Sequence, residues 1–167
     1  MSIDKNKAII EYLTNTTTGC PKIVANPVFF NFSEAKNNNK QIIATSNEKA
    51  VQKPFIDGSV LKQYTFTIID YKSITYQAIV KIIGTTAYNN ENVEEMLEVQ
   101  DIIDWITEQN DNRHFPNFGS DCIIEEITAL TENPRLNGVD ISASPALARY
   151  SVSIKVTYLD ISKKLWK

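Results

Sequence analysis

Few residues of this chain belong to types that do covalent or metal chemistry, and they are far apart. The 167 residues include one histidine, His114, and two cysteines, Cys20 and Cys122. Nucleophilic catalysis needs a nucleophile, a base and an orienting group, and the sequence places no such set around His114. A structural zinc site needs about four clustered cysteine or histidine ligands. We therefore predict no catalytic residue, no metal site and no cofactor, and interpret His114 as a surface or partly packed side chain.

Carboxylates are the one reactive group that occurs at close spacing. Within one expected helix lie Glu94, Glu95, Glu98, Asp101 and Asp104. Such a set could form an acid–base pair or bind a hard cation, but on a helix it more simply forms a solvated face. The glycines are isolated, so the sequence lacks the glycine-rich motifs of phosphate-binding loops and dinucleotide folds.

The composition is that of an ordinary globular protein. Apolar residues make up 43% and charged residues 22%, and the formal net charge is −3. A protein that coats nucleic acid needs clustered Lys and Arg, so this balance argues against that class. The N-terminus lacks the apolar core of a signal peptide, and no apolar run approaches the roughly 20 residues that span a bilayer. We expect one domain over residues 1–167, free thiols, no membrane partner and synthesis in a cytoplasm.

The expected sheet is organised around a β-favouring run at residues 53–71. Successive strand side chains point to opposite faces, which puts Tyr64, Phe66 and Ile68 together on the core face. Residues 149–158 alternate apolar and polar side chains, as in an antiparallel strand with one buried face.

Three further strands are expected at residues 23–32, 41–45 and 121–130. The first contains Pro27, so it lies at a sheet edge or begins after that residue. In the third, the side chains expected on one face are Ile123, Ile127 and Ala129.

Two helices are expected to pack on this sheet. Residues 90–110 carry an apolar stripe at helical spacing, and Asn92 and Glu95 match the spacing of a capping box. The stripe consists of Val99, Ile102, Ile103 and Ile106. Trp105 borders it and should cover the sheet edge. A short helix at residues 2–13 should begin with Ser2 as its cap. The predicted class is α+β, with a mainly antiparallel sheet packed against one long and one short helix.

Four segments look suited to contacts outside the core. Asn37, Asn38 and Asn39 read as an exposed hairpin tip. Residues 72–83 read either as the second strand of a ribbon or as a flexible arm, extending to residue 88, that orders against a partner. Residues 131–145 read as a long loop, and loops of that length are often functional. The tail at 161–167 carries Trp166, which should dock on this subunit or a neighbour.

A family of phage proteins resembles this chain in three segments that occur in the same order. These are PFIDGSVLKQYTF (54–66), VEEMLEVQDIIDWITEQN (93–110) and PALARYSVSIKVTYLD (145–160), with a P.FG loop at 116–119. The family is that of the minor capsid or tail terminator proteins of long-tailed phages of Gram-positive hosts. The resemblance covers most of residues 1–160, and its weight rests on the order and spacing of the segments.

The resemblance implies a tail-terminator-like subunit that forms a ring, most simply a hexamer, on the head-proximal end of a tail tube. The implied partners are the protein itself, the tail tube protein, and a sheath or head–tail connector protein, with DNA only as cargo in the lumen. The implied location is the virion tail or neck after synthesis in the bacterial cytoplasm. A collar of a headless contractile tail-like bacteriocin, a small soluble adaptor and an enzyme of unrecognised type remain alternatives.

Side chains in the contact segments are the candidates for the ring and tube interfaces. They are Asn37, Asn38, Asn39, Lys72, Tyr76, Lys81, Asn137 and Trp166. Lysines spread over the expected strands could protect a sheet edge from aggregation or, in a ring, line a positive channel that faces DNA.

Overall fold

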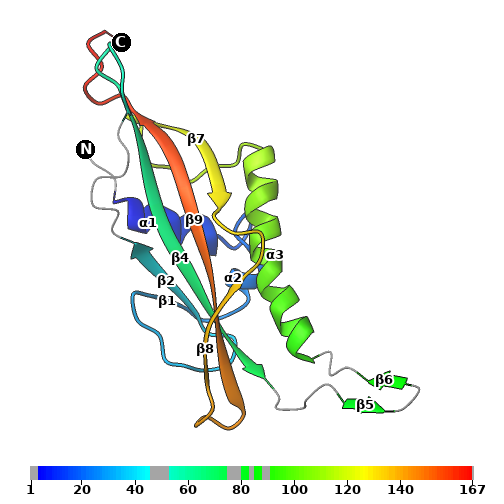
Figure 1. The fold of residues 1–167 in the computed structure, drawn as a ribbon. Coiled ribbons are helices and arrows are strands. Elements are labelled where there is room, and N and C mark those ends of the chain that lie inside the picture. Colours follow the sequence, from blue (N-terminus) through cyan, green and yellow to red (C-terminus); the bar gives the residue numbers. More distant parts are fainter. Residues whose placement is uncertain (1–3, 46–52, 75–79, 83–84, 88–90, 167) are drawn as a thin grey trace.

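Two 15-residue strands, β4 (Val60–Ile74) and β9 (Ala146–Asp160), pair antiparallel over their whole length and form a long blade (Figure 1). The computed structural model describes residues 4–45, 53–74, 80–82, 85–87 and 91–166. Phe66 in β4 and Ile154 in β9 are fully buried and pair directly across the two strands. The predicted core faces of both strands are thus confirmed.

The other strands of the main sheet flank this blade. On one side β2 (Lys40–Thr45) pairs antiparallel with β4, and β1 (Val28–Phe30) pairs parallel with β2 at the sheet edge. On the other side β7 (Cys122–Ala129) pairs antiparallel with β9.

Two shorter strands, β3 (Lys53–Pro54) and β8 (Arg135–Asp140), extend the blade beside β4 and β9 respectively. Among the described residues the main sheet has seven strands, its main path is β1-β2-β4-β9-β7, and its one parallel pair is β1–β2. The predicted α+β class with a mainly antiparallel sheet is confirmed.

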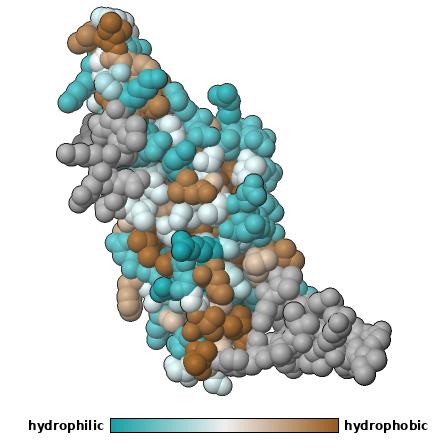
Figure 2. All heavy atoms as spheres, in the orientation of Figure 1, coloured by the Kyte–Doolittle hydropathy of each residue, from teal (hydrophilic) through white to brown (hydrophobic). Residues whose placement is uncertain are grey.

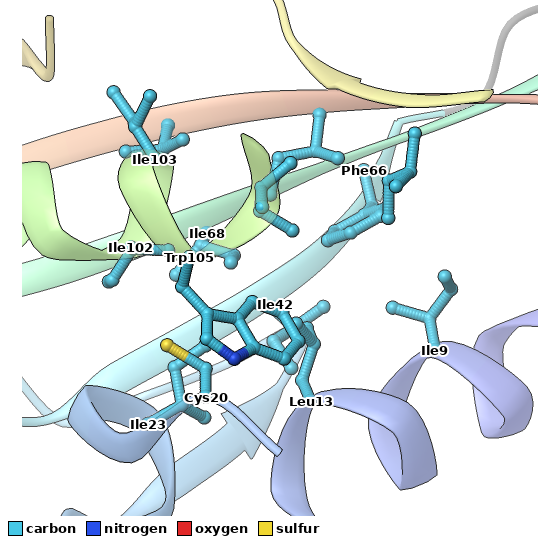
Figure 3. Packing of buried hydrophobic residues seen from close by; sticks show 14 of the residues in the cluster. Ile9, Leu13, Cys20, Ile23, Ile42, Phe66, Ile68, Ile102, Ile103 and Trp105 are labelled. Atoms are coloured by element: carbon cyan, nitrogen blue, oxygen red, sulfur yellow. The ribbon is translucent and has the colours of Figure 1, made fainter. Parts of the chain in front are cut away.

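In the described part of the chain, three helices pack against the sheet: α1 (Lys5–Thr14), α2 (Pro21–Val24) and α3 (Glu91–Asp111). In Figure 1 the strands of the blade pass in front of α1 and α2, and α3 runs along one side. The predicted stripe on α3 is confirmed, because Val99, Ile102, Ile103 and Ile106 are all buried. Its Trp105 lies toward α1 and α2 rather than over a sheet edge (Figure 3).

The helix starts differ from the prediction. Asp4 caps α1, with its Oδ1 accepting the Asn6 N–H at 2.9 Å, and Ser2 lies outside the described residues. Helix α3 already includes Asn92, which therefore cannot cap it, since a cap needs a non-helical backbone. Residues 21–24 form α2 instead of strand because Pro21 suits a first helical position. The strand, β1, begins after Pro27 and also lies at the sheet edge, so both predicted alternatives hold.

The predicted face of residues 121–130 is wrong for Ile123, which is 51% exposed, and right for Ile127, which is fully buried. The register of β7 against β9 shifts between Ile124 and Glu126. A bulge of this kind adds one residue, Glu125, and so reverses the inward and outward positions before it.

Residues 131–145 are not one long loop, since they contain β8. This strand forms a hairpin with β9 and is exposed along its whole length, so no alternation of buried side chains marks it in the sequence. Residues 72–83 are not one strand either. Strand β4 continues to Ile74, and β5 (Val80–Ile82) pairs with β6 (Thr85–Ala87) in a separate two-stranded sheet. Residues 75–79 and 83–84 lie outside the described part of the chain.

Candidate interaction surfaces

The residues considered for catalysis do not converge. The side chain of His114 is exposed, and its main chain is used structurally: its N–H donates to Gln109 O at 2.9 Å, and its carbonyl accepts the Tyr12 hydroxyl at 2.7 Å. Over the described ranges, no three His, Cys, Asp or Glu side chains gather in a way that could hold a metal ion. None of the described helices is long and apolar enough to cross a membrane.

A buried cluster of ionic groups lies where β2 and β4 meet α3. Lys40 Nζ donates to Asp70 Oδ1 at 2.7 Å, and both side chains are only 1% exposed. Burial raises the pKa of Asp70 and lowers the pKa of Lys40, against their mutual attraction. Next to this pair, Lys72 is also 1% exposed and is held by Glu98 and by Glu95 at 3.3 Å.

Lys72 was predicted at an interface, but its side chain is buried, and its ammonium pairs with carboxylates of the same subunit. Burial alone would lower the pKa of Lys72, but its hydrogen bond to Glu98 and the nearby carboxylates of Asp70 and Glu95 raise it above the ordinary value. The hydrogen bond from Lys72 in turn lowers the pKa of Glu98. The contacts of Lys72 with Glu95 and Glu98 tie the end of β4 to α3.

The segment with three asparagines is not an exposed hairpin tip. It connects the parallel strands β1 and β2 and is tied to β4 by hydrogen bonds. Asn38 Oδ1 accepts from Lys72 Nζ at 2.8 Å, and Asn37 Oδ1 accepts the Ser73 N–H at 2.8 Å. Asn39 is buried. Asparagine serves here to accept hydrogen bonds from Lys72 and from the main chain of β4, and to adopt the positive φ of 65° at Asn38.

One end of the blade forms an ordered apolar surface, which we call the tip: residues 53–59 and 161–166. The two segments are joined by Leu165 N–H donating to Asp57 O at 2.8 Å and by a 3.5 Å ion pair between Lys164 and Asp57. Gly58, at φ +86°, lies so close that a Cβ there would come within 2.5 Å of Lys163 O. The backbone of the tip is thus well specified by contacts within the subunit.

The apolar side chains of the tip nevertheless face solvent. Ile56 is 96% exposed, Leu165 70% and Trp166 61%. The expectation that Trp166 docks on this subunit is wrong, which leaves its alternative, a neighbour, untested. Burying such side chains is worth about 1.5–3 kcal/mol each, so their exposure favours a binding surface.

Asp160 fixes the start of the tail within the tip, and its titration can be tested. Hydrogen bonds from Lys62 and from Ser162 hold the pKa of this carboxyl well below its usual range. A lowered folded-state pKa stabilises the fold above the ordinary carboxyl pKa, and this stabilisation is lost as pH falls through the lowered value. We expect Asp160→Asn to cost about 1.5–3 kcal/mol at neutral pH and to flatten the pH dependence of stability below about pH 5.

Urea unfolding at several pH values measures both effects of Asp160→Asn. Glu132→Gln, at an exposed carboxylate with no ion pair in the described part of the chain, is the control for the loss of one negative charge. An Asp160→Asn curve as steep as the wild-type curve below pH 5 would show that the hydrogen bonds to Asp160 are not present in solution.

The opposite end of the blade, formed by β8 and its turn to β9, also exposes apolar side chains. Leu136 is 52% exposed and Ile141 70%. Asn137 is exposed too, and its Nδ2 donates to Ser151 Oγ at 2.6 Å, which holds β8 onto β9. Figure 2 shows brown, apolar atoms at both ends of the blade.

Between these ends, the sheet face turned away from the helices includes hydroxyl side chains at the centre of the β4–β9 pair. Thr67 and Ser153 face each other across β4 and β9, with their hydroxyl oxygens 3.0 Å apart. The ion pair of Lys155 and Glu126, at 3.8 Å, lies on the same face. Among the described elements, no helix packs on this side of the sheet.

The predicted interface residues differ in exposure. Trp166, Asn137 and Asn37 are exposed, whereas Lys72 and Asn39 are buried and Asn38 is half-buried. Lys81 lies in β5, and Tyr76 lies outside the described residues. Sequence reasoning missed Ile56 and Ile141. The available signal was an apolar residue directly beside turn-forming residues: Phe55-Ile56 precede Asp57-Gly58, and Ile141 stands between Asp140 and Ser142.

No protein-family model matches this chain, and no curated protein matches it in sequence.

Proposed function

We propose that this chain is a structural virion protein that forms a ring on the head-proximal end of a phage tail tube. The ring stops growth of the tube and joins it to the head or its connector, and it acts by binding rather than by catalysis. Three segments resemble tail terminator proteins and occur in the same order along the chain, which supports this proposal. Its partners are further copies of itself, the tail tube protein and a connector or sheath protein.

One structural observation carries the proposal furthest: the blade exposes large apolar side chains at both of its ends. A monomer gains nothing from Ile56, Leu165 and Trp166 in water at one end, or from Ile141 at the other. A head-to-tail contact between unlike surfaces closes into a ring and covers such surfaces on every copy. The rigid β4–β9 pairing holds the two ends at a fixed separation, as a ring of defined size requires.

The direct test is the mass of the assembled species. We expect native mass spectrometry and sedimentation to show an assembly of about six copies, alone or when tail tubes are added, and electron microscopy to place it at one end of each tube. A monodisperse monomer that ignores tubes at high concentration would contradict the proposal. Images of the native particle distinguish a phage neck from a collar on a headless tail-like particle.

The apolar tip supplies a mutational form of this test. Ile56→Asp should weaken ring assembly at least about tenfold, because it places a charge in a contact that excludes water. The unfolding free energy of the monomer should change by less than about 0.5 kcal/mol, since Ile56 is 96% exposed. Thr17→Asp, which adds the same charge at an exposed site between α1 and α2, should assemble as wild type. Equal assembly of both variants would exclude Ile56 from the interface.

A further inference from the structure

The exposed face of α3 is acidic along its whole described length. Its exposed carboxylates, at positions 94–111, are Glu94, Glu98, Asp101, Asp104, Glu108 and Asp111. The helix contains no Lys or Arg, and it has no basic residue in its last turn. Lys22 from α2 lies 3.3 Å from Asp101 and 4.0 Å from Glu98. In the described part of the chain, no cation pairs with the acidic groups at 94, 104, 108 and 111.

This arrangement works against the stability of the isolated subunit. Asp104 and Glu108 are four residues apart, and Glu108 and Asp111 three, so like charges are neighbours on the helix surface. Both pairs also lie toward the C-terminal end of α3, where the helix dipole disfavours negative charge. A solvated helix face needs charge but not this repulsion, which binding to a cationic surface would relieve.

The tip carries the complementary combination of charge and apolar surface. Lys53 and Lys163 are exposed on it, and neither makes an ion pair with another described residue. The same two segments expose the side chains of Ile56 and Leu165. Among the described residues, acidic groups also lie at or beside the tip. Asp57 is already paired with Lys164, Glu125 lies beside Phe55 and Ile56, and the main-chain carbonyl of Asp121 accepts the Ile161 N–H.

We infer that the tip of one copy docks on the acidic face of α3 in the next copy. Lys53 and Lys163 meet the carboxylates of that face, and the apolar tip covers Leu97, which is 52% exposed among those carboxylates. In Figure 1 the tip and α3 lie on different sides of the molecule, so each copy can use one surface toward each neighbour. Such a contact is heterologous and propagates around a ring. The inference rests on the proposed ring and specifies its contact.

Charge reversal on each surface tests this contact. Lys53→Glu with Lys163→Glu reverses the tip, and Asp104→Lys with Glu108→Lys reverses α3. Each double variant should weaken assembly by about 100-fold or more, because like charges then face each other. A 1:1 mixture of the two variants should restore assembly, since reversed tips meet reversed helices and native tips meet native helices alternately around an even-numbered ring. The variant with all four substitutions has an acidic tip and a basic α3. Its copies should therefore assemble with one another but not with wild-type copies.

Controls and contrary outcomes separate this inference from the proposed function. Lys7→Glu with Lys36→Glu makes the same charge change at exposed sites on α1 and the β1–β2 connection and should assemble as wild type. Urea unfolding checks that every variant folds. If both reversed variants assemble as wild type, or if their mixture fails to assemble, the tip–α3 contact is wrong while the ring stands. If the wild-type chain itself forms no ring with or without tubes, both are wrong.

Discussion

Asp70→Ala is expected to lower the free energy of unfolding by about 3–5 kcal/mol, because it leaves the Lys40 ammonium buried without its partner. Lys40 Nζ and Asp70 Oδ1 are 2.7 Å apart, and both side chains are 1% exposed. The remaining neighbour of this ammonium is a main-chain carbonyl, Asn38 O, at 3.4 Å. A lone buried ammonium must either stay charged without a counter-ion or lose its proton, and each choice costs several kcal/mol.

A paired substitution shows what the ion pair itself contributes. Lys40→Met with Asp70→Leu removes both charges and retains most of the volume, so we expect a stability within about 1 kcal/mol of wild type, or above it. Glu132→Ala, at an exposed carboxylate between β7 and β8, should change stability by less than about 0.5 kcal/mol. Urea unfolding of the single and double variants measures the coupling. A loss below about 1 kcal/mol for Asp70→Ala would mean that water or Glu98 reaches Lys40.

The Lys40–Asp70 pair shows where sequence patterns stop being informative. The alternation in β9 and the apolar stripe on α3 predict burial correctly because one face of each element meets the core over many residues. Lys40, Asp70 and Lys72 occupy that same core face of β2 and β4, but they are charged and read as surface residues. These side chains are buried because β2, β4 and Glu98 on α3 bring opposite charges together in the fold. A periodic pattern within one element contains no information about such a contact.

Edges and turns were harder to predict than the centre of the sheet. Strand β8 is paired on one side only and exposed on both faces, so its sequence, RLNGVD, carries no signal of burial. The Ile123 error came from a single inserted residue, Glu125, which shifts every earlier side chain to the other face. The exposed tip was missed because apolar residues beside a turn are expected to fold inward. Apolar residues that contact another molecule stay exposed in the isolated subunit, and no pattern within one chain signals this.

Trp105→Ala is expected to lower the free energy of unfolding by about 3–5 kcal/mol, as large core deletions do. Trp105 is 9% exposed, and its ring centroid lies 5.2 Å from that of Tyr12. Figure 3 shows the indole beside Cys20 and Ile23, between α3 and the two N-terminal helices. The side chain thus joins α1 and α2 to α3, and its loss opens a cavity where three elements meet.

A control on the same helix decides whether this loss reflects packing or helix propensity. Leu97→Ala removes a side chain that is 52% exposed and should cost less than about 1 kcal/mol, while the alanine keeps α3 helical. Trp105→Phe should recover part of the Trp105→Ala loss, because it refills much of the cavity. Guanidinium unfolding at one protein concentration, low enough to keep the chain monomeric, measures all three. If Trp105→Ala costs no more stability than Leu97→Ala, Trp105 does not join α1 and α2 to α3 in solution.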